Sequence, residues 1–267
     1  MRNIIKNNWS YLFWFAYYIL LFGLLTFGII IPIYIAMLLI ALSPFAEELY
    51  HRVIGVRPLR LSSEKIRLTP LFDEVYEQSI SIYPRMPKRV VLYIQESMDI
   101  NAFAFGKCSL VLTKGSINML DDGHLKGLIA HELGHFANGD TKVNLFFAIA
   151  NLPMTLLLSF GNKIQNRLET GILKFVFDII FSIFKGINFI SELMIAHQSR
   201  QNEYRADYFA LMCGFGVDLS EVLTEIYEIS LEKPRTIKEQ LKSTHPPLTK
   251  RVELLESDLY NEDMQKE

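Results

Sequence analysis

The stretch that decides the fold is His131-Glu132-Leu133-Gly134-His135, which lies inside a helical pattern covering 125–138. On a helix, residues four apart lie one turn above each other, so His131 and His135 project from the same face. Two imidazoles at this spacing can share a tetrahedral Zn²⁺, and Glu132 points toward the adjoining open position. Two histidines and one glutamate at fixed offsets arise by chance in about one chain in a hundred at ordinary residue frequencies. The stretch therefore predicts a hydrolytic metal site holding one zinc ion per chain.

The segments on either side of this stretch predict a mainly α-helical domain with a small β-sheet. Asp121 and Asp122 are candidate N-caps of the motif helix, and Gly139 is a residue that would end it. An amphipathic helix is expected at 66–83. Segments rich in Val, Leu, Tyr, Ile and Phe predict short strands at 89–95, 101–106 and 109–113.

A catalytic zinc site needs a third protein ligand, and the polar helix after 196 offers Glu203 followed one turn later by Asp207. Two carboxylates at this spacing repel on an isolated helix unless a cation or a histidine N–H lies between them. We therefore expect Glu203 on the metal and Asp207 behind a ligand histidine. The alternative is a solvated face on which Arg200 and Arg205 neutralise both acids. The rival ligands are Glu192, His197 and His245.

Composition predicts a membrane protein. Half of the 267 residues are apolar and the mean hydropathy is positive. The net charge of −2 gives no indication of nucleic-acid binding.

Residues 9–45 carry no charge and as one helix would be about 55 Å long, against roughly 30 Å of hydrocarbon. We expect two short spans turning near 28–32, with one tilted helix broken at Pro32 as the alternative. Residues 1–46 form the predicted anchor.

Basic residues flank this anchor on both sides. Two precede it and five follow it, namely Arg2, Lys6, Arg52, Arg57, Arg60, Lys65 and Arg67. By the positive-inside rule, either topology places the following catalytic domain in the cytosol, at the cell (inner) membrane. Cys108 and Cys213 match no metal or redox spacing, so we expect reduced thiols, with a single disulfide as the alternative.

A hydrophobic insertion divides the catalytic domain into 47–142 and 197–267. Within this insertion, at 143–196, the first apolar run lacks charge and the second carries Lys174, Asp178, Lys185 and Glu192. Their spacing draws one polar stripe along a helix, which favours a hairpin segment packed on the membrane surface or against a partner over a lone lipid-exposed span. A charged face inside a bundle is the other possibility. Because the segments before and after it share one metal, the insertion crosses the bilayer an even number of times or not at all.

Four motifs give the chain a specific resemblance. They are Asn-Ala-Phe-Ala at 101–104, His-Glu-Leu-Gly-His at 131–135, Asn-Glu-Tyr-Arg-Ala-Asp at 202–207 and His-Pro-Pro-Leu-Thr-Lys-Arg at 245–251. In this order the chain resembles the HtpX-like membrane zinc endopeptidases, relatives of the Ste-type CAAX prenyl proteases. The resemblance extends from the anchor to about Leu255.

The resemblance implies a gluzincin-type α+β catalytic domain with an N-terminal transmembrane hairpin and a hydrophobic helical insertion. It implies that His131, His135 and Glu203 bind zinc and that Glu132 is the catalytic base. It also implies that His245 and Arg251 line the site and contact substrate or the oxyanion. From the residues alone, His245 in its proline-flanked loop is as consistent with a surface position. The strand that would border the substrate cleft contains Asn101, Ala102, Phe103 and Ala104.

The predicted activity is metal-assisted hydrolysis of peptide bonds in membrane or membrane-associated proteins at the cytosolic face. A part in protein quality control follows from the resemblance and the anchor. The alternatives are a membrane-anchored pseudoprotease or adaptor, and a prenyl-protein (CAAX-type) protease. A transporter fits less well, because the apolar segments are few and show no repeat. The expected partners are protein or peptide substrates and the lipid bilayer, without nucleic acid, and the sequence does not predict an oligomeric state.

Overall fold

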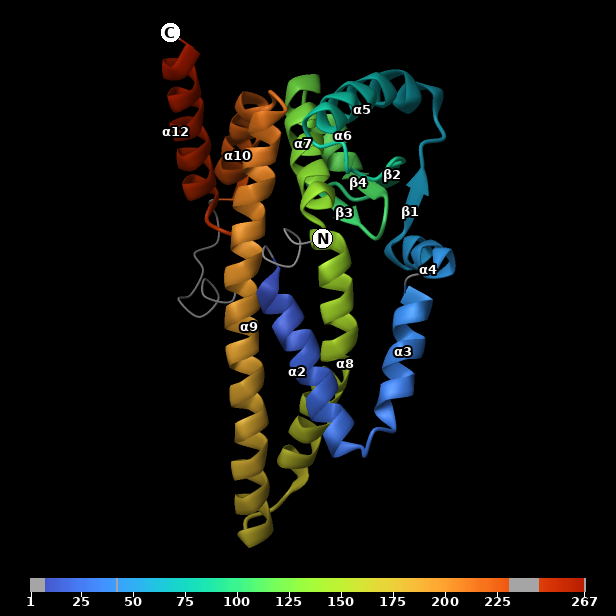
Figure 1. Cartoon of the computed structure of the whole chain (residues 1–267), viewed down its shortest axis with the longest axis vertical. Helices are drawn as coiled ribbons and strands as arrows, with labels where there is room; N and C mark the ends of the chain where they lie inside the picture. The colour runs from blue at the N-terminus through green and yellow to red at the C-terminus, as the bar shows by residue number, and fades with distance from the viewer. Residues whose placement is uncertain (1–7, 42, 231–244, 267) are drawn as a thin grey trace.

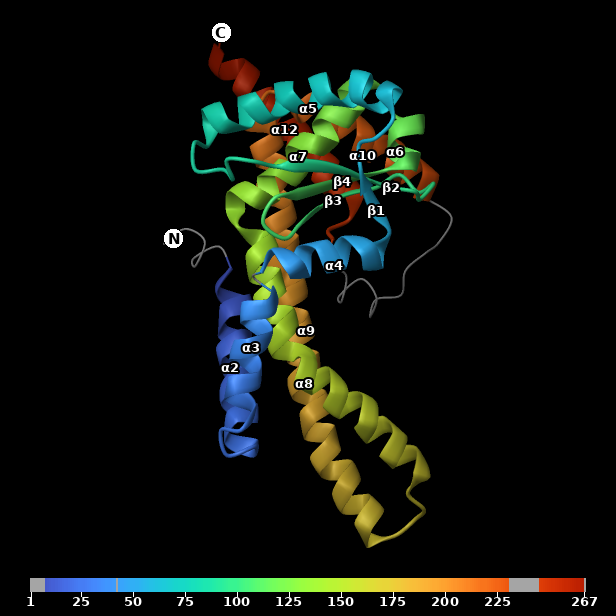
Figure 2. The same ribbon diagram turned by 90° about the vertical axis from the view of Figure 1, so that its right-hand side faces the viewer.

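The computed structural model describes residues 8–41, 43–230 and 245–266 of the chain. Figure 1 shows a head that contains a small sheet and several helices, with further helices descending from one side of it. The protein is mainly α-helical with one small mixed sheet, which confirms the predicted fold class at this level. Figure 2 shows that α4 (Pro44–Ile54) runs crosswise between the head and the descending helices.

The sheet has four strands in the order β1-β2-β4-β3. β2 (Val91–Gln95) and β4 (Ser109–Thr113) pair in parallel, and β1 (Val56–Pro58) and β3 (Ala102–Phe105) pair antiparallel at the two edges. All five residues of β4 are buried, as expected of a central strand. β3 is left as an edge strand, with its outer side unpaired by any other strand of this sheet.

Helices of the head pack around one continuous apolar core. They are α5 (Ser62–Ile82), α6 (Lys114–Met119), α7 (Asp122–Asn138), α10 (Gly216–Ser230) and α12 (Leu248–Lys266). The core joins α5, the sheet, α7 and α10 through side chains that include Leu68, Ile94, Leu112, Ile129, Leu133 and Leu219. This packing holds α7, the motif helix, at the centre of the head.

Both predicted ends of α7 are correct. The Asp121 carboxylate accepts a hydrogen bond from the backbone N–H of His124 at 2.8 Å. Gly139 ends the helix with a φ of 77°, a left-handed conformation that glycine adopts without strain. The chain then turns directly into α8 (Asp140–Arg167).

Two apolar helices occupy the predicted anchor. α2 (Trp9–Leu25) and α3 (Ile30–Ala41) are joined by a turn at 26–29. α3 has twelve residues and is therefore about 18 Å long, well short of the roughly 30 Å hydrocarbon core. The second of the two expected short spans is therefore not completed by α3 alone.

Within the described parts of the chain, one helix is long and apolar enough to cross a membrane, by length and composition. It is α9 (Ile172–Met212), whose 41 residues give a length of about 61 Å. It forms a hairpin with α8 that points away from the head (Figure 2) and then continues without a break into the head.

The polar stripe of α9 faces α8. Gln165 of α8 donates a hydrogen bond to Asp178 Oδ1 at 2.8 Å and accepts one from Lys185 Nζ at 2.8 Å, while its carbonyl accepts one from Lys174 Nζ at 3.2 Å. Glu192 accepts from Asn188 on its own helix. The polar stripe of α9 therefore contacts a neighbouring helix of the same chain.

Candidate active site

The two motif histidines lie on one face of α7, with their rings 4.9 Å apart and nearly perpendicular. His131 is buried, and the side chain of His135 is 16% exposed. The Nε2 atoms of both rings face the carboxylate of Glu203. His131 Nε2 lies 3.6 Å from Glu203 Oε2, and His135 Nε2 lies 3.7 Å from Glu203 Oε1.

Gly134 allows Glu203 to come this close. A Cβ atom at this position would lie 2.9 Å from the Cα of Ala206 on α9, a separation that real side chains do not tolerate. The motif glycine therefore lets the backbones of α7 and α9 touch between the two histidines. This contact brings a carboxylate that is 68 residues away in the sequence to both imidazoles.

These three side chains fit a zinc ion. Donor atoms about 2.0–2.1 Å from a tetrahedral zinc lie about 3.4 Å from one another, close to the 3.6 and 3.7 Å seen between Glu203 and the two Nε2 atoms. His131, Glu132 and His135 also form a group whose donor atoms lie within 4.8 Å of one another, so Glu132 competes for the third place. Glu203 is the better third ligand because each of its oxygens approaches one Nε2 atom.

A carboxylate holds the outer nitrogen of each histidine. His131 Nδ1 lies 2.9 Å from Asp207 Oδ1, and His135 Nδ1 lies 3.0 Å from Asp140 Oδ2. Such pairs fix the tautomer that donates from Nδ1 and leave the Nε2 lone pair for a metal. Asp207 was expected in this position, but Asp140 was missed. The available signal was its place directly after Gly139, where the chain turns back beside the last turn of α7.

Arg251 of α12 joins the two acids of α9. Its Nε and Nη2 lie 2.8 and 2.6 Å from the two oxygens of Asp207, and its Nη1 lies 3.1 Å from Glu203 Oε2. Burial raises the pKa of Asp207, but the guanidinium and His131 together hold it below its usual range. The Arg251 side chain is only 6% exposed. Arg251 therefore lines the candidate site, as the resemblance implied, and it pairs there with Glu203 and Asp207. Its contact with substrate or the oxyanion stays a prediction.

His245 lies at the rim of the site. Its Nδ1 is 3.2 Å from Glu203 Oε2, and two thirds of its side chain is exposed. The contact with Glu203 raises the pKa of His245. The exposed ring is in a position to meet a bound substrate.

Glu132 is held by the edge strand. The backbone N–H of Ala104 donates to Glu132 Oε2 at 2.7 Å, and burial raises the pKa of this carboxyl group. The backbone N–H and C=O groups of successive residues in a strand point alternately toward the paired strand and away from it. Those of Ala102 therefore point away from β4, as those of Ala104 do. The N–H of Asn101 does not point outward, since it donates to Thr113 Oγ1 and Ser116 Oγ. Phe103 pairs with Val111 inside the sheet.

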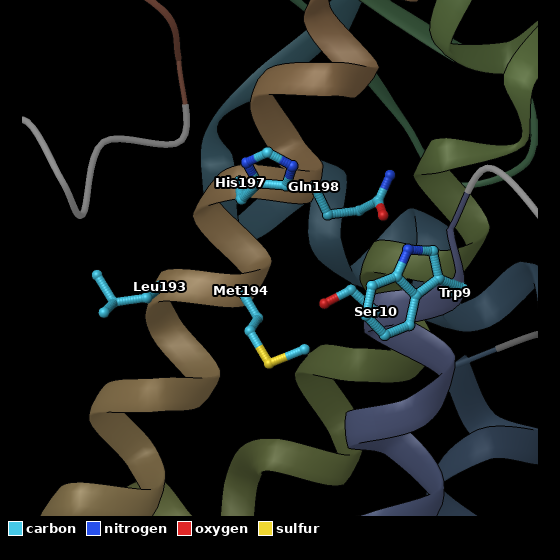
Figure 3. A pocket seen from close by; sticks show the side chains of 6 residues that line it. All are labelled: Trp9, Ser10, Leu193, Met194, His197 and Gln198. Carbon is cyan, nitrogen blue, oxygen red and sulfur yellow. The ribbon is translucent and has the colours of Figure 1, made fainter.

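The two other rival ligands lie elsewhere. Glu192 is bonded to Asn188, and His197 borders a cavity of about 200 Å³ between α2 and α9 (Figure 3). The side chains that line this cavity are Trp9, Ser10, Leu193, Met194, His197 and Gln198. The cavity contains none of the residues around Glu203. Cys108 and Cys213 are free thiols, as predicted.

Comparisons with known proteins agree with this arrangement. Residues 69–258 match the family model described as peptidase family M48. Three curated relatives, each named Protease HtpX homolog, come from Aquifex aeolicus, Methanopyrus kandleri and Bacillus subtilis. The first is 27% identical over 243 residues, covering 79% of this chain and 77% of the relative. The second is 33% identical over 200 residues, covering 64% and 61%, and the third is 29% identical over 229 residues, covering 77% and 74%.

A solved structure has a similar fold. The crystal structure of S. mikatae Ste24p superposes with a TM-score of 0.54 at 17% sequence identity. The match covers 94% of this chain but only 63% of that one. At this identity the likeness concerns the fold alone.

Proposed function

This chain belongs to peptidase family M48 and is similar to its HtpX-like membrane proteases, and we propose that it is a zinc metalloendopeptidase acting on membrane and membrane-associated proteins. The observation that carries the proposal is the convergence of His131, His135 and Glu203 beside a separately held Glu132. This is the ligand set and base of a gluzincin. When bound there, zinc supplies a Lewis acid for the scissile carbonyl and makes a water molecule more acidic.

Glu132 is the proposed general base and acid. Ala104 N–H holds one carboxylate oxygen, which orients the other oxygen toward the ligand histidines. Burial raises the pKa of the carboxyl group, which brings its proton affinity closer to neutral pH. Glu132 can then accept a proton from water and deliver it to the leaving amine. No covalent enzyme intermediate is needed.

The edge strand β3 supports a sequence-tolerant mode of substrate binding. An extended peptide can add to an exposed strand edge through backbone hydrogen bonds, which do not read side chains. The outward edge at Ala102 and the carbonyl of Ala104 lie next to Glu132, which already accepts the Ala104 N–H. Such binding suits an enzyme that removes damaged or misassembled membrane proteins, and we propose quality control of this kind as its task.

The Glu132→Gln variant of the full-length purified protein tests the proposal. We expect it to retain about one zinc ion and to lose peptide hydrolysis by at least about 10³-fold, since the base is gone while the ligands stay. Glu48→Gln on α4, where the side chain is 59% exposed, is the matched control and should stay fully active. Equal activity of Glu132→Gln and wild type would exclude the protease mechanism and favour an adaptor.

The proposed orientation places the head in the cytosol. A single cysteine at exposed Arg60 and another at exposed Glu169, each in a chain whose two native cysteines are replaced by serine, report the two ends of the molecule. We expect a membrane-impermeant thiol reagent added outside the cell to label the second position only. Labelling of position 60 from outside would reverse the orientation.

A further inference from the structure

Asp140 is a buried carboxylate that needs a cation. Its side chain is 3% exposed, one oxygen accepts from His135 Nδ1, and the other lies 3.9 Å from Arg205 Nη2. A buried charge without a compensating partner is strongly destabilising. The guanidinium of Arg205 is the cation that faces Asp140 behind His135.

Arg205 is in turn held by an amide on its own helix. Its Nη2 donates to Asn202 Oδ1, which also accepts from Gln198 Nε2 at 3.2 Å. Asn202 and Gln198 are buried, and Asn202 directly precedes Glu203 on α9, so this cluster lies next to the candidate site.

The other end of the Asn202 amide reaches the beginning of the chain. Its Nδ2 donates to Asn8 Oδ1 at 3.1 Å, across 194 residues of sequence. Asn8 is fully buried and is the N-cap residue of α2. The first turn of α2 is thereby connected to His135 through Asn202, Arg205 and Asp140.

Apolar packing beside this connection is incomplete. The cavity between α2 and α9 lies at Trp9 and Ser10 on one side and at Met194 and Gln198 on the other (Figure 3). This cavity is open to the surface, and side chains that line an open pocket make fewer van der Waals contacts than those in a closed interface. At this turn of α2 the polar contact of Asn8 thus contributes more to its position than it would in a densely packed interface.

We infer that Asn8 is a positioning residue of the metal site, so that the first turn of α2 sets the orientation of His135 rather than serving only as part of an anchor. The inference rests on the proposed zinc site. Without the Asn8 side chain, the Asn202 amide loses one hydrogen bond and no longer fixes the position of Arg205. Asp140 and the His135 imidazole can then turn away from the orientation that binds metal. Partners behind a ligand histidine commonly change metal affinity 10- to 100-fold, and we expect the more distant Asn8 to act at the lower end.

The test measures the zinc dissociation constant of the full-length protein in detergent by competition with a chromophoric chelator. We expect Arg205→Ala to weaken zinc binding about 10- to 100-fold and Asn8→Ala about 5- to 10-fold. The double variant should bind no more weakly than Arg205→Ala alone, because both changes interrupt one chain of contacts. Asn8→Ser keeps an uncharged oxygen acceptor at the N-cap of α2 and should lose less affinity than Asn8→Ala.

Two controls separate positioning from general stability. Phe13→Ala alters an exposed residue of α2 and should change neither zinc binding nor unfolding, while Trp14→Ala removes a buried ring and should lower stability without weakening zinc binding. Wild-type affinity in Asn8→Ala, or additive effects in the double variant, would overturn the inference. Failure of the protease proposal would instead be seen as an active Glu132→Gln variant, whatever the zinc affinities.

Discussion

The head and the α8–α9 hairpin place apolar and polar side chains in opposite ways. In the head, apolar residues such as Ile129 and Leu133 are fully buried in one cluster. In the hairpin, Gln165 and Lys185 meet between the helices, while the apolar residues Ile172, Leu173 and Phe175 are 84%, 72% and 65% exposed. Water favours the first arrangement, and an apolar surface as continuous as the second requires lipid or a protein partner.

The candidate active site is an exception within the head, because several charged side chains are buried there beside the apolar core. Glu203, Asp207 and Arg251 are each at most 7% exposed at the side chain, and they are kept by mutual pairing. Buried ions need such partners in either environment. The two regions therefore differ in where their apolar side chains lie, but in both of them buried polar groups are paired. Each prediction below tests the difference or the shared rule.

The largest effect is expected at the cation of the site. Arg251→Met leaves the carboxylates of Glu203 and Asp207 buried without their guanidinium, and breaking a buried pair in this way typically costs about 3–5 kcal/mol. We expect a loss of that size in the unfolding free energy of the metal-free protein, measured by denaturant titration. Arg52→Met, at a side chain that is 76% exposed and paired with Glu48, is the control and should change stability by less than about 1 kcal/mol. If Arg251→Met lowered the unfolding free energy by less than about 1 kcal/mol, the burial of Glu203 and Asp207 would not depend on the guanidinium.

The second prediction compares one residue type in both regions. Ile129→Ala in α7 removes a side chain that is 0% exposed and should cost about 2–5 kcal/mol. Ile180→Ala in α9, where 51% of the residue is exposed, should cost less than about 0.5 kcal/mol in a bilayer, because lipid is as apolar as the removed group. Unfolding of both variants in bicelles measures the difference. Equal losses would mean that Ile180 is covered by protein.

The third prediction concerns pH. Burial lowers the pKa of His135, but its hydrogen bond to Asp140 and the charges of Glu132 and Glu203 outweigh this and raise it to about 9. A raised histidine pKa stabilises the folded metal-free protein fully below about pH 6.5 and loses that contribution as pH rises through 9. We expect the unfolding free energy of the metal-free protein to decrease by up to about 3 kcal/mol between pH 6.5 and 9. The decrease is measured as a fall in the melting temperature.

Two controls check the origin of this pH dependence. Asp140→Asn should reduce the fall, since it removes the carboxylate that holds the imidazolium. Saturating zinc should reverse its direction, because the metal binds the neutral imidazole. A metal-free melting temperature that is constant from pH 6.5 to 9 would contradict the assignment to His135.

The parts of the molecule that could be predicted from sequence are those fixed by local contacts. The spacing of His131 and His135 defines a helix face by geometry alone, and Asp121 and Gly139 mark the ends of that helix through their own backbone preferences. The strands at 91–95, 102–105 and 109–113 follow from their β-forming residues. The position of Glu203 beside the two histidines could be predicted because a catalytic zinc site needs a third protein ligand.

The parts that could not be predicted depend on which elements meet. Asp140 carries no distinguishing pattern until the turn at Gly139 brings it behind His135. The resemblance implied that Arg251 lines the site, but only the packing of α12 against α9 shows that it pairs with both Glu203 and Asp207. Gln165 lies in a segment that reads as a polar connection, yet it is the partner of the charged stripe on α9. Sequence periodicity identifies a polar face but does not say what the face contacts.

The smallest effect is expected at Gln165 itself. Gln165→Leu removes the side-chain hydrogen bonds to Asp178 and Lys185, and hydrogen bonds between membrane helices average about 0.6 kcal/mol with a maximum near 1.7 kcal/mol. We therefore expect a loss of about 1 kcal/mol in the stability of the full-length protein in bicelles. Asn166→Leu, at the next and exposed position, should have no effect.

A double variant tests whether Gln165 and Lys185, the polar residues that meet between α8 and α9, stabilise the hairpin together. In Gln165→Leu the Lys185 ammonium keeps its contact with the Phe181 ring, 4.4 Å away, but loses its oxygen partner. Replacing both residues by leucine removes the stranded charge, so the double variant should be at least as stable as Gln165→Leu alone. If the two losses simply add, Lys185 gains nothing from Gln165, and the hairpin would then be held by its apolar contacts, as the head is. Non-additivity would show that polar pairing stabilises the interior of the hairpin, where the head uses apolar packing.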